Sequence, residues 1–334
     1  MICDAAIIGA GTAGLAAERA ARQAGAKTLL IDDCFTGTTC ATVGCMPSKL
    51  LIAAANAAHN IDRAPAFGLR TTAPIVDGQA VMVRLRKERD AFVAATLKSI
   101  EHLPPGICVQ QRARFLSETT LALGDGRPVS AKAVVVATGA RPSIPERFKA
   151  LGGLVLTNET VFELGSLPRS IAVVGAGPLG LELAQAFVRL GVDVEVFEQT
   201  DHVAALHDVE VANELKLILG AELPMHFNAR LDVAASGHLA RIEWSGASSG
   251  AKSFERVLVA AGRAPALGDL NLAASGIPLD DRGVPQVNDT TLQCGDARSS
   301  WRGTLTVRDP FCTKPCSKAP CRAERGNVPK RAKK

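Results

Sequence analysis

One sequence pattern occurs twice in this chain, and it constrains the fold more than any other feature. Residues 3–9 read as a short apolar strand, GAGTAG opens a helix, and KTLLID is a second strand that ends at Asp32. Residues 171–198 repeat this order, with GAGPLG and an acid at Glu198. In both copies the acid lies 23 residues after the first glycine. This order and spacing predict two parallel βαβ units, each able to bind a dinucleotide.

The glycines and the acid of each copy are expected to contact the dinucleotide. The glycines permit a tight turn and close approach of the backbone, and the helix N-terminus faces the pyrophosphate. The alternative is a turn that binds nothing, but the flanking strand, helix and acid favour binding. Glu198 would repel a 2′-phosphate, and no Arg follows closely, which favours NAD over NADP. The expected contacts are Gly9, Gly11, Gly14 and Asp32 in the first unit and Gly175, Gly177, Gly180 and Glu198 in the second.

The remaining segments complete an α/β fold with two Rossmann-like domains and small antiparallel sheets. Helices are predicted from Pro47 to about His59 and near 80–102, and alternation at 107–123 predicts a small antiparallel sheet. Buried strands at 133–139 and 256–265 close the two units. The expected divisions are 1–148, 149–268, a return segment 269–296, and a tail 297–334.

A cysteine pair, Cys40 and Cys45, lies in the stretch TGTTCATVGCMPSKLL at residues 36–51. Pro47 suits the first turn of a helix, so Cys45 is expected near a helix N-terminus, where the dipole lowers a thiol pKa. Gly44 lets the loop bring the two sulfurs together. A redox disulfide, two incidental core thiols and half of a metal site remain open. The metal reading is the weakest, because ligand pairs are usually two to four residues apart.

Composition excludes several classes of protein. The chain has no apolar run of membrane-spanning length, and MICDAAIIGAG lacks the basic region of a signal peptide. A cytoplasmic location without membrane contact is therefore expected. Nine cysteines without a secretory signal indicate catalysis, metal or reduced thiols rather than a disulfide scaffold.

The basic charge is confined to the tail. Residues 297–334 hold eleven Lys and Arg against two acidic residues, whereas the rest of the chain holds 27 basic and 31 acidic residues. The tail lacks periodic apolar positions and is expected to be disordered. A nucleic-acid partner is disfavoured, because only Trp301 and Phe311 interleave the charges. A zinc site at Cys312, Cys316 and Cys321 lacks a fourth ligand.

Taken in order, the motifs resemble those of the class I pyridine nucleotide-disulfide oxidoreductases over roughly residues 2–296. The matching motifs are GAGTAG, the CxxxxC-x-P-S-K box, VVVATGARP, GAGPLGLE and VAAGRAP. The PSK ending and Glu198 are most similar to the dihydrolipoyl dehydrogenase branch. The resemblance implies FAD and NAD as cofactors, a Cys40–Cys45 redox disulfide, no metal, and a small dithiol or a lipoyl domain as substrate.

The resemblance also implies roles for individual residues. Cys40 would attack the substrate disulfide and Cys45 would lie under the flavin. Lys49 would lie near the flavin with Glu182 as its partner on the nicotinamide side, although without the family both read as a solvated helix face. The remaining implied cofactor contacts are Thr138 and Gly139 at the flavin nucleotide, Ala113 in place of a family glycine near the adenine, and Gly262 by the nicotinamide.

After residue 296 the resemblance stops. Family members continue through an alanine-glycine-aspartate turn that holds the flavin, and then through a dimerisation domain that supplies a His-Glu pair. Here Cys294-Gly295-Asp296 comes about ten residues too early, and no His follows His238. Codons permitted for residues 298–306, read two bases out of frame, encode Ile-Phe-Val-Ala-Gly-Asp-Ala-Asn, and the same frame over 311–315 permits Leu-His-Glu-Ala.

The hypothesis is therefore a truncation or frameshift near Asp296 that removes the dimerisation domain. Impaired activity and no family homodimer are expected. The alternative function is a non-catalytic nucleotide-binding remnant or an interaction protein that uses the basic tail.

Overall fold

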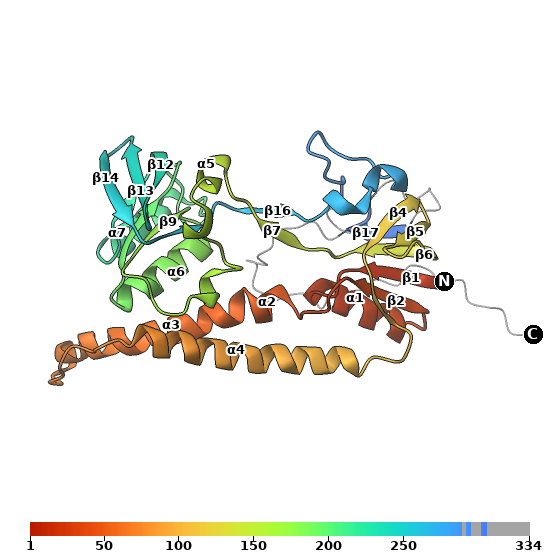
Figure 1. Cartoon of the computed structure of the whole chain (residues 1–334), viewed down its shortest axis with the longest axis horizontal. Coiled ribbons are helices and arrows are strands. Elements are labelled where there is room, and N and C mark those ends of the chain that lie inside the picture. Colours follow the sequence, from red (N-terminus) through yellow and green to blue (C-terminus); the bar gives the residue numbers. More distant parts are fainter. Residues whose placement is uncertain (289–291, 295–301, 306–334) are drawn as a thin grey trace, which may run out of the picture. The chain divides into compact units, whose positions relative to one another are not determined.

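The computed structural model describes residues 1–288, 292–294 and 302–305, and it divides into two compact units (Figure 1). The first unit holds Met1–Phe35, Leu103–Ala140 and the chain from Pro265 onward. The second holds Thr36–His102 and Arg141–Ala264. The strands β7 (Ala140–Pro142) and β16 (Arg263–Pro265) pair with each other in a two-stranded sheet. No helix in the described part of the chain is long and apolar enough to span a membrane.

A mixed sheet forms the first unit, in the order β3-β2-β1-β6-β5-β4. The strands β3, β2, β1 and β6 are parallel neighbours, while β5 pairs antiparallel with β6 and with β4. The helix α1 connects β1 to β2, as a βαβ unit requires. The bounds are β1 Ile2–Ile8, α1 Thr12–Gln23, β2 Thr28–Asp32, β3 Cys108–Gln110, β4 Ala113–Ser117, β5 Thr120–Leu123 and β6 Pro128–Val136, with short 3₁₀ turns at Gly268–Leu270 and Leu272–Ser275.

Alternating residues of the strands supply the two faces of this sheet. Ile7 and Leu30 pack with Leu15 of α1 on one face. Ile8 and Ile31 point to the other face, into a cluster that also contains side chains of β4, β5 and the 3₁₀ turns. The segment 107–123 is predicted to form a small antiparallel sheet, and β4 and β5 do pair antiparallel. They belong to the main sheet, however, and β3 pairs in parallel with β2.

The strand β17, Arg302–Leu305, pairs in parallel with residues 133–136 of β6. Most of the tail predicted to be disordered, 297–334, lies outside the described residues, but these four form a strand and differ from that prediction. The physical reason is the edge of β6. Its carboxyl half pairs with β1 on one side only, since β5 reaches no further than Ser130, so the other edge presents backbone groups to a further strand.

A parallel sheet in the order β11-β10-β9-β15-β8 is the centre of the second unit. The helix α6 connects β9 to β10, and a three-stranded antiparallel sheet, β12-β13-β14, follows α7. The bounds are β7 Ala140–Pro142, α5 Glu146–Lys149, β8 Val155–Leu156, β9 Ser170–Val174, α6 Pro178–Arg189, β10 Asp193–Phe197, α7 Val209–Gly220, β11 Met225–His226, β12 Arg230–Ser236, β13 Leu239–Ser245, β14 Gly250–Phe254, β15 Arg256–Val259 and β16 Arg263–Pro265, with 3₁₀ turns at Gly152–Leu154 and Val161–Glu163.

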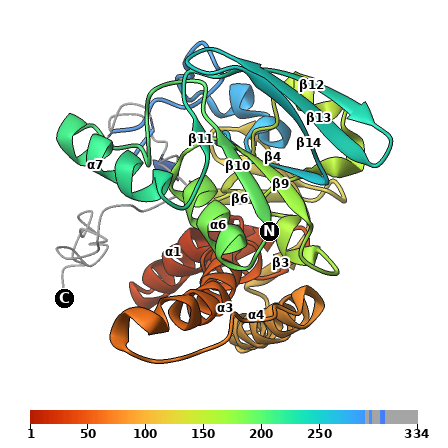
Figure 2. The same cartoon turned by 90° about the vertical axis from the view of Figure 1, so that its left-hand side faces the viewer.

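Three helices precede this sheet in the sequence: α2 (Thr39–Thr42), α3 (Cys45–Arg63) and α4 (Gly78–Glu101). Side chains of α3 and α4 belong to the main buried cluster of this unit. The helices α3 and α4 run side by side (Figures 1 and 2), joined through the 3₁₀ turn Ala64–Phe67. Leu51 and Ala55 of α3 lie in one buried cluster with Leu183 and Phe187 of α6. This packing explains why 36–102 groups with the second unit, whereas the sequence assigned it to a first domain ending at 148.

Candidate nucleotide and disulfide sites

The first glycine-rich turn connects β1 to α1, and its glycines have different tasks. Gly9 has φ +105°, and a Cβ there would lie 2.3 Å from the carbonyl oxygen of Ala137. A Cβ at Gly14 would lie 1.8 Å from the carbonyl oxygen of Gly9. A Cβ at Gly11 would have no atom within 4 Å. The fold itself therefore requires the first and third glycines, while the space beside the second leaves room for a pyrophosphate at the start of α1.

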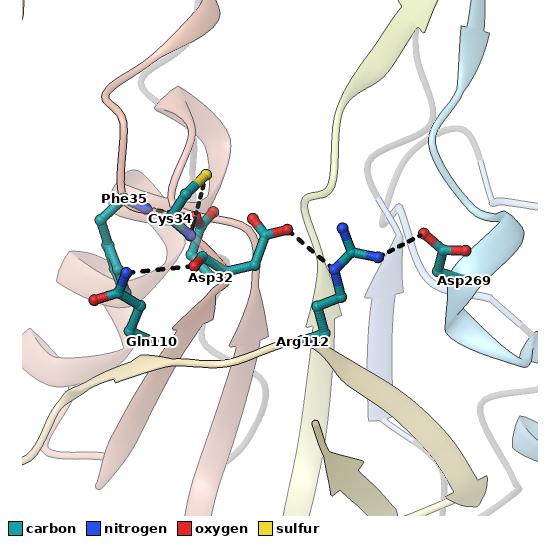
Figure 3. Close-up of polar contacts among 7 residues, drawn as sticks. Asp32, Cys34, Phe35, Gln110, Arg112 and Asp269 are labelled. Atoms are coloured by element: carbon teal, nitrogen blue, oxygen red, sulfur yellow. Dashed lines mark hydrogen bonds and ion pairs between the residues drawn. The ribbon is translucent and has the colours of Figure 1, made fainter. Parts of the chain in front are cut away.

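Backbone donors hold the carboxylate of Asp32 beside this turn. Its Oδ2 accepts from the N–H of Ala10 at 2.7 Å, and its Oδ1 accepts from the N–H groups of Cys34 and Phe35 at 3.1 and 2.8 Å. Figure 3 shows Asp32 with Cys34 and Phe35 at the end of β2. A carboxylate has about four acceptor positions, so capacity remains for a ribose hydroxyl. The structure thus places Asp32 where the sequence predicted an acceptor.

Arg112 fixes the neighbouring loop. Its Nε donates to Asp33 at 3.2 Å, and its Nη1 lies 3.7 Å from a carboxylate oxygen of Asp269 (Figure 3). In the same loop, ligand atoms of Asp32, Asp33 and Cys34 lie within 4.8 Å of one another. Since Asp32 already accepts three backbone hydrogen bonds, this group is a structured turn and carries no metal assignment.

Thr138 and Gly139 follow β6 next to the same turn. The hydroxyl of Thr138 is buried and has no hydrogen-bond partner among the residues that the structure describes. Its backbone nitrogen would lie 3.1 Å from a Cβ at Gly9. Gly139 has φ +70° and open space at its Cβ position. A buried hydroxyl without a partner is costly, so its position fits a polar ligand such as FAD. Ala113, by contrast, is buried in the core of the first unit.

The second glycine-rich turn, between β9 and α6, repeats this geometry. A Cβ at Gly175 or Gly180 would lie 2.5 or 2.2 Å from a backbone oxygen, whereas Gly177 has open space. Glu198 accepts from the N–H of Ala176 at 2.9 Å and from the N–H and hydroxyl of Thr200 at 3.0 Å. Gly262, after β15, also has open space at its Cβ position. The open space beside Gly177 and the position of Glu198 fit a second dinucleotide, as Gly11 and Asp32 fit the first.

The cysteine pair lies at the start of α3. The hydroxyl of Thr38 accepts from the N–H of Ala41 at 3.2 Å and caps α2, which ends two residues before Gly44. A Cβ at Gly44 would lie 2.8 Å from the carbonyl oxygen of Thr39, so only glycine fits this turn. The helix α3 begins at Cys45 rather than at Pro47, which places Cys45 even closer to the helix N-terminus than predicted.

The two thiols interact directly. Cys40 is partly buried and Cys45 is exposed, and both are free thiols, which corresponds to the reduced form of a disulfide. Burial, followed by a hydrogen bond and charge repulsion from Cys45, raises the pKa of Cys40 to about 11. Cys40 therefore keeps its proton at neutral pH. The structure brings the predicted pair together.

Lys49 and Glu182 also meet, as predicted. The Nζ of Lys49 lies 2.9 Å from a carboxylate oxygen of Glu182, so α3 and α6 are bridged one turn beyond the cysteines. Both side chains are roughly half exposed, at 61% and 45%. An exposed pair of this kind contributes ~0–1 kcal/mol to stability. The small contribution to stability therefore does not explain why these two residues are paired.

Sequence reasoning missed Asn158. This buried side chain donates to the carbonyl oxygen of Val43, between the two cysteines, and accepts from Arg263. The two ends of the Asn158–Val43 bond are 115 residues apart in the sequence. No local pattern marks such a contact, although Arg263 lies inside the VAAGRAP motif.

Comparison with known proteins gives one consistent family. The model of the family described as "Pyridine nucleotide-disulphide oxidoreductase" matches residues 3–296. The dihydrolipoyl dehydrogenase of Bacillus subtilis (strain 168) is 31% identical over 306 residues, which cover 87% of this chain and 66% of that protein. The mercuric reductase of Lysinibacillus sphaericus is 29% identical over 298 residues, covering 86% and 53%.

A solved structure has the same fold. The Cu(II) complex of the HOCl-induced flavoprotein disulfide reductase RclA from Escherichia coli superimposes with a TM-score of 0.76 at 21% sequence identity. The match covers 91% of this chain and 65% of that one. The chain thus spans less than two thirds of the length of these three proteins.

Proposed function

The chain belongs to the pyridine nucleotide-disulphide oxidoreductase family, and we propose that it exchanges electrons between a dithiol and NAD through FAD and the Cys40–Cys45 pair. FAD and NAD(P) are the cofactors that the family and its flavoprotein relatives imply. The observation that carries the proposal is the pair of neighbouring thiols at the start of α3, in a turn that only Gly44 fits.

The exchange is written for a substrate that carries two thiols. One substrate thiolate attacks the Cys40 sulfur of the disulfide, forms a mixed disulfide and releases Cys45 as a thiolate. The second substrate thiol then attacks the substrate sulfur that is bonded to Cys40, closes the substrate disulfide and releases Cys40. The substrate leaves as a disulfide, one of its two protons passes to Cys40 and the other leaves the sulfur groups, and both electrons remain on Cys40 and Cys45. The raised pKa of Cys40 keeps the proton on this sulfur.

FAD, when bound, would supply an acceptor for this electron pair, and NAD would supply the next acceptor. We assign the first turn, with Asp32, Thr138 and Gly139, to FAD, and the second, with Glu198 and Gly262, to NAD. Open space beside Gly11 and Gly177 supports both assignments. Lys49 and Glu182 are assigned to the flavin and nicotinamide side of the thiol pair, which their 2.9 Å contact next to the cysteines supports.

Among the disulfide and dithiol substrates of the family, we propose one class. A dihydrolipoyl group, free or on a lipoyl domain, is proposed because Cys40 is followed by the GCMPSK ending and the second acid is Glu198. One relative is a mercuric reductase, so a metal ion is the competing substrate for the same two sulfurs. Turnover with dihydrolipoamide and NAD, compared with oxidation of NADH in the presence of Hg²⁺, separates the two.

We also propose that activity is impaired and that the homodimer of the family does not form. Residues 297–334 contain neither the flavin-holding aspartate turn nor the His-Glu pair. A frameshift near Asp296 would explain both. Sequencing the gene tests this, because an intact frame with neither motif in the alternative reading contradicts it.

The direct test of function is NAD reduction by dihydrolipoamide with added FAD, for the wild type and Cys40→Ser. A slow wild-type rate that disappears in Cys40→Ser is expected. Equal rates in the two proteins, or none in either although FAD binds, would leave the alternative function, a nucleotide-binding remnant that performs no thiol chemistry.

A further inference from the structure

Asn158 connects two segments of the second unit that are far apart in the sequence. Its side chain is buried, at 5% exposure, and its Nδ2 donates to the carbonyl oxygen of Val43 at 2.9 Å. Val43 lies between the two cysteines, at the junction where α2 ends and the Gly44 turn begins. The Asn158 amide therefore holds the backbone that determines the separation of the two sulfurs.

The other end of the Asn158 amide is held by Arg263. The Nη1 of Arg263 donates to the Asn158 Oδ1 at 2.8 Å, and the arginine side chain is only 8% exposed. Burial lowers the pKa of the Arg263 guanidinium, while Glu159, 3.8 Å from Nη2, acts in the opposite direction. Arg263 follows Gly262, whose carbonyl oxygen accepts from the N–H of Ser143 at 3.0 Å.

The backbone around Asn158 is fixed by its own turn. The N–H of Thr157 donates to the hydroxyl of Thr160 at 3.0 Å, and the N–H of Thr160 donates to the carbonyl oxygen of Thr157 at 3.1 Å. The N–H of Glu159 donates to the Thr157 hydroxyl at 3.2 Å. A substitution of the Asn158 side chain therefore leaves these backbone contacts in place and removes only the bridge.

We propose that Asn158 is a positioning residue that ties the Cys40–Cys45 segment to Arg263 and the Gly262 turn, and that this bridge favours closure of the two thiols into a disulfide. The inference rests on the proposed function of the thiol pair. Releasing Val43 would let the segment sample more conformations, so the sulfurs would meet less often and the dithiol would be favoured.

The experiment measures the equilibrium of the full-length protein with dithiothreitol and needs no cofactor. Oxidised dithiothreitol takes both electrons and both protons from Cys40 and Cys45, giving the protein disulfide and reduced dithiothreitol. After acid quenching and alkylation, the mass of the peptide that carries Cys40 and Cys45 gives the oxidised fraction. We expect Asn158→Ala to lower the equilibrium constant for oxidation of Cys40 and Cys45 by oxidised dithiothreitol about 3- to 10-fold, because one buried hydrogen bond contributes a free energy of this size.

Two further variants separate positioning from folding. Asn158→Asp keeps an acceptor for Arg263 but loses the donor to Val43, so it should melt close to the wild type and still shift the equilibrium. Asn56→Ala is the matched control, because Asn56 accepts from Arg189 at 3.0 Å on the same helix α3, three turns from Cys45. It should leave the equilibrium within about twofold of the wild type.

An equilibrium constant within twofold of the wild type in both Asn158 variants overturns the proposal, whatever their melting temperatures. So does an equal shift in Asn56→Ala. The assay is independent of flavin, so a protein that binds no FAD would contradict the proposed function while the role of Asn158 is still decided by the thiols.

Discussion

Within each glycine-rich turn, substitutions of the second and third glycines are predicted to affect different properties, nucleotide binding and folding stability. The first and third approach backbone oxygens at distances that no Cβ tolerates, and the second has open space. Substitution of the third glycine should therefore lower the stability of the fold, and substitution of the second should weaken nucleotide binding.

Gly11→Ala and Gly14→Ala form a matched pair for this prediction. Gly14→Ala should lower the free energy of unfolding by about 1–3 kcal/mol or more, because its Cβ meets the Gly9 carbonyl. Gly11→Ala should unfold at the wild-type denaturant midpoint and bind FAD at least about tenfold more weakly, the effect of a loss of ~1.4 kcal/mol. Urea unfolding and FAD titration measure the two. Equal FAD affinity in Gly11→Ala and the wild type would contradict the placement of the pyrophosphate.

The thiol of Cys40 predicts a pH dependence. Its pKa is raised from 9.0 to about 11 by burial and by Cys45. A group whose pKa is raised on folding stabilises the fold below its unfolded pKa, and this contribution is lost as pH rises through the folded value. Stability should therefore be unaffected by this group below pH 9 and fall between pH 9 and about 11.

Chemical denaturation over this pH range checks the prediction, with Cys40→Ser as the comparison. The serine variant should show a smaller loss of stability above pH 9. An identical pH profile in both proteins would show that the environment of Cys40 does not hold the proton in this way.

At the scale of helices and strands, the sequence predicted the two βαβ units well because each rests on local signals: an apolar strand, three glycines and an acid at fixed spacing. It predicted α3 and α4 as helices to within a few residues. It did not predict that Leu51 and Ala55 of α3 pack with Phe187 of α6, so it assigned these helices to the other domain. An apolar stripe shows that a helix is buried, not which element buries it.

The same limit applies to the site. Cys40, Cys45, Lys49 and Glu182 could be named from motifs, and the structure brings each pair together. Asn158 could not be named, because its importance lies in one side-chain contact across 115 residues.

The bridge between α3 and α6 gives a prediction at this scale. Lys49→Met should change the free energy of unfolding by less than about 1 kcal/mol, since both partners of the ion pair are half exposed. Arg241→Met is the matched control, because Arg241 lies 3.0 Å from Glu243 with similar exposures of 48% and 59%. With FAD bound, only Lys49→Met should slow flavin reduction by a dithiol, severalfold in stopped-flow measurements. Equal rates in the two variants would remove Lys49 from the proposed site.

For the whole molecule, the chain carries both nucleotide turns and the thiol pair but spans less than two thirds of its relatives. The proposed loss of the family homodimer predicts a sedimentation mass near 34.8 kDa at micromolar concentration. A species of twice that mass would contradict the proposed loss of the homodimer.

The central claim is that FAD and the Cys40–Cys45 pair act together on this chain, and the visible spectrum tests it most directly. Purified protein, incubated with FAD, freed of excess and reduced with dithiothreitol, should be yellow and gain absorbance at wavelengths longer than the flavin band. Cys45→Ser should bind FAD and fail to gain it. A colourless wild-type protein after incubation with FAD, or the same long-wavelength gain in Cys45→Ser, would contradict the claim.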